Sequence, residues 1–276
     1  MRLFLLSFLT MLAFAANSVL NRAAVGTIGM DPLEFGAIRL TSGAVALGIL
    51  ILLTKRGFAI GDLGRLFGVG GLLVYIFGFT LAYQRLDAGL GALILFGVVQ
   101  ITMFGGAVVI REPLPIMRWV GAGLAMVGLI WLLWPGGDVA ISLVHALLMI
   151  GAGIGWGVYS LQGRRETDAT QATAVNFILA APFAVAAAFV IPTSGAISTS
   201  GVLLALTSGV ISSGMGYALW YQIIPALGAG RAAVAQLSVP ILAMGGGMLF
   251  LSEPLTFRFL IAATLVISGV LISMRR

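Results

Sequence analysis

Polar and aromatic side chains recur inside long apolar stretches of this chain, often four residues apart. Tyr75 and Phe79 have this spacing, as do Phe96 and Gln100, and residues four apart share one face of a helix. Such faces, with a few amides and hydroxyls among aromatic rings, suit binding of a neutral, partly apolar solute. The candidate binding residues are Tyr75, Phe79, Phe96, Gln100, Trp156, Ser160, Ser213, Tyr217, Gln236 and Ser238. Ordinary helix packing is the alternative for each of them.

Three further residues are candidates for structural or gating roles. Arg39 is the one basic residue well inside an apolar stretch; structural pairing with backbone carbonyls, Glu34 or another helix end is one interpretation, and anion binding or gating is the other. Asn17 would either bond a neighbouring helix or touch solute. Pro240 would kink or bound a helix at a place where a bend would alter a cavity.

The chain lacks the residue clusters that most catalysis requires. It has no Cys and a single His, and no Asp or Glu falls in the middle third of any apolar stretch. A disulfide framework and a thiolate metal site are therefore excluded, and acid–base or metal-ligand clusters are missing. We expect no enzyme activity, no cofactor and no metal.

The apolar stretches themselves predict an integral membrane protein. Hydrophobic residues make up 60% of the chain and charged residues 9%. Stretches of roughly 20 apolar residues can cross the bilayer as helices. Ten are predicted, at 3–24, 33–54, 64–84, 89–110, 115–134, 141–162, 172–191, 199–222, 229–251 and 257–274. Glycines are expected to let helices approach closely; the series from Gly151 to Gly157 indicates close packing, with a hinge as the alternative.

Basic residues predict the orientation of these helices. With ten spans and the N-terminus in the cytoplasm, eleven Lys and Arg residues lie on the cytoplasmic side and three on the other. The positive-inside rule then places both termini in the cytoplasm of a multi-pass inner (plasma) membrane protein. The net charge of +6 thus reflects topology, and no nucleic-acid partner is expected. The first apolar stretch resembles a signal peptide, but we expect it to be retained because 141–162 is its counterpart.

Two short motifs occur once in each half of the chain. Glu112-Pro113-Leu114 is followed 141 residues later by Glu253-Pro254-Leu255, and Tyr83-Gln84 recurs 138 residues later as Tyr221-Gln222. We expect two five-helix repeats, at 1–137 and 138–276. Because five is odd, the second repeat would enter the membrane inverted, and inverted repeats underlie alternating access in transporters. An old duplication in a protein that does not transport is the alternative.

The chain resembles the drug/metabolite transporter superfamily, and within it the EamA-type exporters. The resemblance rests on Trp156-Gly157 in the sixth span, Arg39 in the second, and Glu-Pro after the fourth and ninth. It covers the whole chain and is greatest to exporters of aromatic and other neutral amino acids. The first half departs from the pattern, with Ala15-Ala16 in place of Trp-Gly. The resemblance implies a central cavity built by spans 1, 3, 4, 6, 8 and 9, with the others as scaffold.

These observations together predict an exporter of small neutral metabolites, aromatic amino acids above all. A channel or an exporter of another metabolite or drug class is the alternative. No candidate cavity residue titrates near neutral pH, so we expect transport down the solute gradient without proton coupling. The expected partners are the lipid bilayer and the solute. The sequence does not predict the oligomeric state and is compatible with a monomer.

Overall fold

The computed structural model describes residues 2–54, 57–58, 60–61, 63–109, 115–134, 141–164, 166–191, 197–236 and 238–273. The Glu112-Pro113-Leu114 motif lies outside them. The described elements are all helical: α1 (Arg2–Asn21), η1 (Arg22–Thr27), α2 (Pro32–Leu53), α3 (Arg65–Ala82), α4 (Ala88–Val109), α5 (Ile116–Leu133), α6 (Leu143–Gly163), α7 (Ala169–Val190), α8 (Thr199–Thr207), η2 (Ser208–Met215), α9 (Gly216–Gln236), α10 (Ser238–Leu251) and α11 (Phe257–Ser273). The two η elements are π-helical.

These elements confirm the all-α membrane fold. Within the described ranges, seven helices are long and apolar enough to cross a membrane, and three shorter apolar helices accompany them. They correspond to the ten predicted spans, because η1 continues α1, and α8, η2 and α9 form one continuous helix. Large apolar side chains such as Phe4, Phe189 and Leu249 are exposed on the outside, as a lipid-facing surface requires.

The boundary between the eighth and ninth spans differs from its prediction. The break was expected near 222–229, where Pro225 and Gly228 to Gly230 interrupt the apolar pattern. The structure keeps this segment helical as far as Gln236, with Pro225 inside α9, and starts α10 at Ser238. A proline removes one backbone hydrogen bond without always ending a helix, so it was an ambiguous signal here. Gln236 therefore ends the eighth span.

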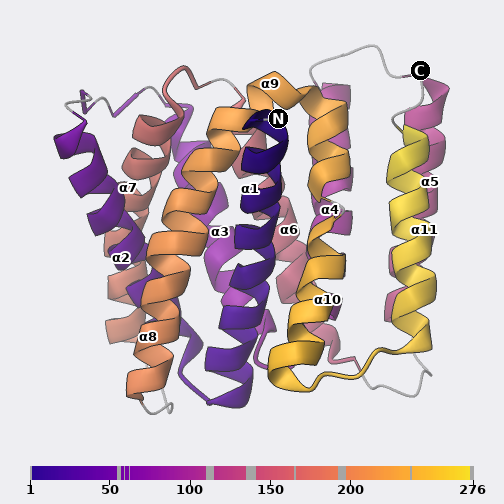
Figure 1. Cartoon of the computed structure of the whole chain (residues 1–276), viewed down its shortest axis with the longest axis horizontal. Helices are drawn as coiled ribbons and strands as arrows, with labels where there is room; N and C mark the ends of the chain where they lie inside the picture. The colour runs from indigo at the N-terminus through magenta and orange to yellow at the C-terminus, as the bar shows by residue number, and fades with distance from the viewer. Residues whose placement is uncertain are drawn as a thin grey trace.

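The helices are arranged as a bundle with one pair set to the side. Figure 1 shows α1, α3 and α6 near the middle of the view, and α5 with α11 standing together at one edge. The start of α1 and the end of α11 lie at the same end of the bundle, which agrees with an even number of spans. The opposite end gathers η1, the start of α4 and the loop between α10 and α11.

Glycines set the closest helix contacts, as the series in α6 predicted. A Cβ on Gly155 would lie 2.6 Å from the Gly71 carbonyl oxygen of α3, and one on Gly153 would lie 2.9 Å from the Leu95 carbonyl oxygen of α4. Both approaches allow only hydrogen at these positions. The packing interpretation of this series is confirmed at these two positions, and α6 is held tightly between α3 and α4.

Candidate functional site

Arg39 lies in the interior of α2 and is completely buried. Its Nε donates to Ser213 Oγ at 2.7 Å, and its Nη2 donates to the hydroxyls of Tyr217 at 2.6 Å and Tyr75 at 3.2 Å. Among the described residues, the guanidinium makes no hydrogen bond to Glu34 or to a backbone carbonyl, and its partners come from other helical elements. Three helical elements besides α2 are thus tied to one buried cation.

The hydroxyls around Arg39 form a network that extends to α1. Tyr217 donates its hydroxyl hydrogen to Tyr75 at 2.9 Å and accepts a hydrogen bond from Asn17 Nδ2 at 3.3 Å. Ser208 and Ser213 both donate to Asn17 Oδ1, at 2.7 and 3.2 Å. We call Asn17, Arg39, Tyr75, Ser213 and Tyr217 the Arg39 cluster; no member is more than 4% exposed.

Aromatic rings surround this cluster. The Arg39 guanidinium carbon lies 5.4 Å from the ring centroid of Tyr75 and 5.2 Å from that of Phe79, which is the cation–π range. Trp156 packs against both tyrosines of the cluster, with centroid distances of 4.9 Å to Tyr75 and 4.6 Å to Tyr217. Phe14 closes the other side of Trp156 at 5.2 Å. The indole Nε1 of Trp156 is buried without a hydrogen-bond partner.

The structure brings together six of the predicted residues around Arg39. They are Asn17, Tyr75, Phe79, Trp156, Ser213 and Tyr217. Phe96 joins at the periphery, stacked on Phe14 at 6.4 Å. Placing Arg39 among them also corrects the expectation that the second span belongs to the outer scaffold, because α2 supplies the central charge.

Other predicted residues are not tied to the cluster by a hydrogen bond. Gln100, Ser160 and Gln236 each carry a buried side-chain polar atom without a partner. Ser238 donates to the Ala235 carbonyl at 2.7 Å and so serves the junction between α9 and α10. Pro240 lies in the first turn of α10, where proline is tolerated, and this place fits a proline that bounds the helix better than one that kinks it.

Sequence reasoning missed two residues of this region, Phe14 and Ser208. Phe14 lies three residues before Asn17 on α1, a spacing that shares a helix face and was a usable signal. Ser208 gave no such signal: it lies at the start of the π-helical η2, and its partner Asn17 is 191 positions away in the sequence. π-helical turns often occur at functional sites in helices.

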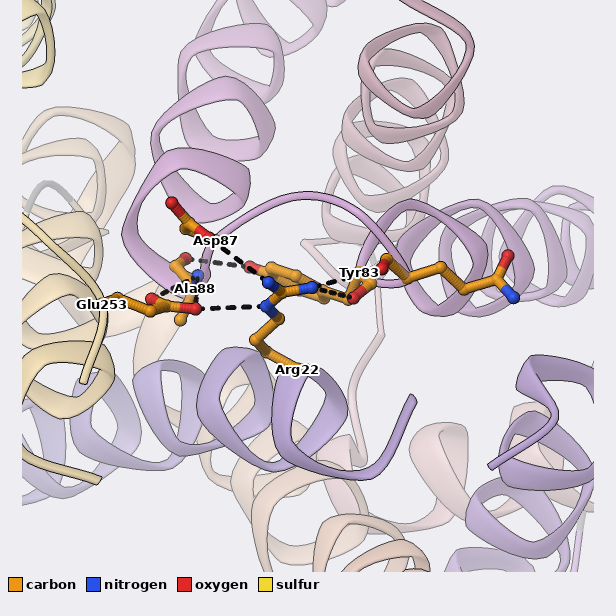
Figure 2. A network of polar contacts seen from close by, with 6 residues as sticks. Arg22, Tyr83, Asp87, Ala88 and Glu253 are labelled. Atoms are coloured by element: carbon orange, nitrogen blue, oxygen red, sulfur yellow. Dashed lines mark hydrogen bonds and ion pairs between the residues drawn. The ribbon is translucent and has the colours of Figure 1, made fainter. Parts of the chain in front are cut away.

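A second arginine, Arg22, forms a different network at the end of α1 (Figure 2). Its Nε lies 3.2 Å from Glu253 Oε1, its Nη2 lies 3.4 Å from Asp87 Oδ1, and its Nη1 donates to the Tyr83 carbonyl at 3.2 Å. Glu253 also accepts the backbone N–H of Ala88 at 2.8 Å. We call Arg22, Tyr83, Asp87, Ala88 and Glu253 the Arg22 cluster.

The Glu-Pro motif of the second half thus caps a helix of the first half. Glu253 is 8% exposed and accepts the N–H of the first residue of α4 with both carboxylate oxygens. Burial raises the pKa of the Glu253 carboxyl above its ordinary value, and Asp87 acts in the same direction, whereas the Ala88 N–H and Arg22 oppose the rise.

Two large grooves have no member of either cluster in their linings. One, of about 790 Å³, lies between α2, α7 and the α8–η2 segment; the other, of about 590 Å³, lies between α4, α5 and α6. Their linings are almost entirely apolar and open outward, as expected for surfaces that lipid covers. Convergent polar groups, which are typical of small-molecule sites, are instead found at the Arg39 cluster.

Comparison with known proteins decides the family. The model of the EamA-like transporter family matches residues 1–134 and 143–275. The chain belongs to the EamA-like transporter family. As a member it is a multi-pass membrane transporter and not an enzyme, as its composition predicted.

Relatives of this EamA-like transporter come from several organisms. An uncharacterized protein of Pseudomonas aeruginosa is 42% identical over 269 residues, covering 98% of this chain and 93% of the relative. The threonine/homoserine exporter RhtA of Escherichia coli is 29% identical over 195 residues, covering 69% of this chain and 64% of the exporter. A solved structure, titled only as a crystal structure of a protein, covers 99% of this chain and 96% of its own at a TM-score of 0.71 and 18% identity, which supports the fold.

Proposed function

We propose that this transporter exports small neutral amino acids, aromatic ones included, out of the cytoplasm across the inner membrane. Both termini would lie in the cytoplasm, as the distribution of basic residues predicts. The solute would occupy the region of the Arg39 cluster and Trp156. It would move by alternating access between two inverted repeats, 1–137 and 138–276, and down its own gradient without a coupled proton.

The observation that carries this proposal is the composition of the Arg39 cluster. Asn17, Arg39 and Tyr75 come from the first half of the chain, and Ser213 and Tyr217 come from the second. A polar site formed between two halves, deep within the bundle, is the arrangement expected of a repeat-based transporter. The two segments matched by the family model fall within the proposed repeats and support the division.

Two further observations favour amino acids as the solute class. RhtA, which is similar over 69% of this chain, is named for export of threonine and homoserine. The aromatic faces of Trp156, Tyr75 and Tyr217 extend the preference to larger side chains, because stacking favours aromatic solutes.

The closed state of the cluster supports alternating access. Since its members are at most 4% exposed, the halves must separate for solute to enter or leave. The Arg22 cluster joins η1 and the start of α4 to the loop after α10, and so ties the halves together at one end of the bundle. Opening at that end would have to separate Glu253 from Arg22 and Ala88.

The test is solute counterflow in sealed liposomes containing the purified protein. A panel of tryptophan, phenylalanine, threonine, homoserine, a cationic drug and a sugar would be loaded in turn, with protein-free liposomes as the control. Saturable counterflow of the amino acids is expected. Saturable flux of another class alone would favour the exporter of different solutes, and non-saturating ion conductance would identify a channel.

The absence of proton coupling has its own test. An imposed pH difference with no solute gradient is expected to cause no accumulation. His145 is the residue whose reference pKa could allow coupling, so His145→Gln serves as the companion variant. Accumulation that persists in that variant would mean a coupling site elsewhere.

A further inference from the structure

One donor of Arg39 is unused. Nε and Nη2 are both engaged by hydroxyl oxygens, but the buried Nη1 has no hydrogen-bond partner. Buried polar groups in proteins are nearly always satisfied, and an exception calls for an explanation. Here the exception is a cationic donor on a residue with no exposed surface.

The charge of Arg39 is also uncompensated. Arginine stays protonated in proteins, so this side chain cannot relieve its burial by losing a proton. None of the ion pairs found in the described part of the chain includes Arg39. Its neighbours are neutral hydroxyls and the rings of Tyr75 and Phe79, which offset only part of the cost of a buried cation.

We propose that Arg39 binds the carboxylate of the transported amino acid through Nη1. This inference rests on the proposed function and deepens it, because it names the group on the solute that the transporter requires. A carboxylate supplies both things that Nη1 lacks, an acceptor and a negative charge, in one charge-assisted hydrogen bond. A zwitterionic amino acid brings that charge without adding net charge to the membrane interior.

The neighbouring groups fit the rest of such a solute. Arg39 bonds the hydroxyls of Tyr75 and Tyr217, and Trp156 packs on the rings of the same two tyrosines. Each of these tyrosines therefore contacts both the guanidinium of Arg39 and the indole of Trp156. An amino acid can therefore place its carboxylate at Arg39 and its side chain against Trp156, with the unpartnered indole Nε1 as a further donor.

The experiment compares an amino acid with its amide. Counterflow of labelled phenylalanine would be inhibited by unlabelled phenylalanine or by phenylalaninamide, which keeps the ring and the ammonium group and lacks only the carboxylate. The wild type should prefer the acid by about ten- to hundredfold, the range for a hydrogen bond to a charged group. In Arg39→Gln this preference should fall toward equality, with Arg39→Lys in between.

Arg258→Gln is the matched control. Arg258 is on α11 and donates to the Trp131 carbonyl of α5 at 3.0 Å. Neither residue belongs to the Arg39 cluster, so this variant should keep the wild-type preference. If Arg39→Gln transports too slowly to measure, the same ratio can be measured as ligand binding by quenching of tryptophan fluorescence in detergent.

The outcomes separate this inference from the function on which it rests. Equal inhibition of the wild type by acid and amide would overturn the inference even if no variant folded. So would a preference that persists in Arg39→Gln, because the carboxylate would then be recognised elsewhere. Absence of flux for every amino acid in the wild type would instead remove the proposed function, and this inference with it.

Discussion

The two arginines at the centre of this molecule and at its end have opposite surroundings. Arg22 lies where α1 gives way to η1 and has two carboxylates and two backbone carbonyls around its guanidinium. Arg39 lies in the interior of α2 and has hydroxyls and aromatic rings around it, but no carboxylate from the described residues. Arg65, at the start of α3, follows the first pattern, with Glu166 3.0 Å away.

The difference indicates which charge serves the fold. At the helix ends the chain supplies both members of each ion pair, so the folded protein itself compensates the charge of the arginine. At the centre it supplies only the cation and leaves one donor free. A charge that the fold leaves uncompensated inside the membrane marks a place where another molecule completes the interaction.

The largest expected effect comes from replacing Arg39 by Met. Transport should be lost, because the carboxylate has no anchor. The melting temperature in detergent should stay the same or rise, because an uncompensated buried charge is removed while Tyr217 and Tyr75 keep their mutual bond. Counterflow and thermal unfolding on the same preparation provide the measurement.

A fall in stability with Arg39→Met as large as that from breaking the Arg22 cluster would contradict the comparison. Arg39 would then be a structural residue like Arg22, and its free Nη1 would carry no functional meaning.

The second effect concerns stability at the Arg22 cluster. Glu253→Ala removes the acceptor of the Ala88 N–H and one of the two carboxylates of Arg22. We expect a loss of about 2 kcal/mol in the free energy of unfolding, the size of a buried group left without its partner. Asp87→Asn, which changes the more exposed partner, should cost less, since exposed pairs contribute little. Equal losses in the free energy of unfolding would show that burial does not determine how much each carboxylate stabilises the Arg22 cluster.

Much of this fold could be predicted from the sequence because a bilayer demands long apolar helices. Run length and basic residues gave ten spans, and only the break near Pro225 was misplaced, since proline and glycine do not always end a helix. The candidate residues at four-residue spacing on α3, Tyr75 and Phe79, were found because periodicity reports a shared face.

The centre of the site could not be assembled in the same way. Periodicity places residues on a face but does not say which faces meet, so Arg39 was assigned to an outer helix. Its contact with Ser213 joins residues 174 positions apart, and Ser213 lies in a π-helical turn that no spacing pattern predicted. Glu253 was noticed as part of a repeated motif, but its partner Ala88 is 165 positions away, and their contact follows from the packing of α4 against α10.

A smaller effect is expected at Trp156, and it concerns selectivity between aromatic and non-aromatic amino acids. Trp156→Ala should weaken transport of phenylalanine and tryptophan more than that of threonine, by about five- to thirtyfold in apparent affinity, because stacking area is lost. Trp131→Ala on the outer face of α5 is the matched control, since Trp131 is 48% exposed. Equal losses for all solutes at normal expression would assign Trp156 to packing alone.

The smallest effect is the pH dependence of the Arg22 cluster. The pKa of Glu253 is raised above its ordinary value of 4.5, with burial as the main cause. The folded protein therefore binds this proton more tightly than the unfolded chain does. The resulting stabilisation is complete below the ordinary pKa and is lost as the pH rises through the folded pKa.

In Glu253→Gln, which cannot titrate at this position, that contribution is absent. Melting temperatures of both proteins should be measured from pH 7 downward, with Asp87→Asn in both so that only Glu253 differs. The wild-type carboxyl should gain stability relative to Gln as the pH falls toward 4.5. A relative loss over this window would mean that attraction to Arg22 outweighs burial, and that the Glu253 carboxylate is held by Arg22 more strongly than its burial suggests.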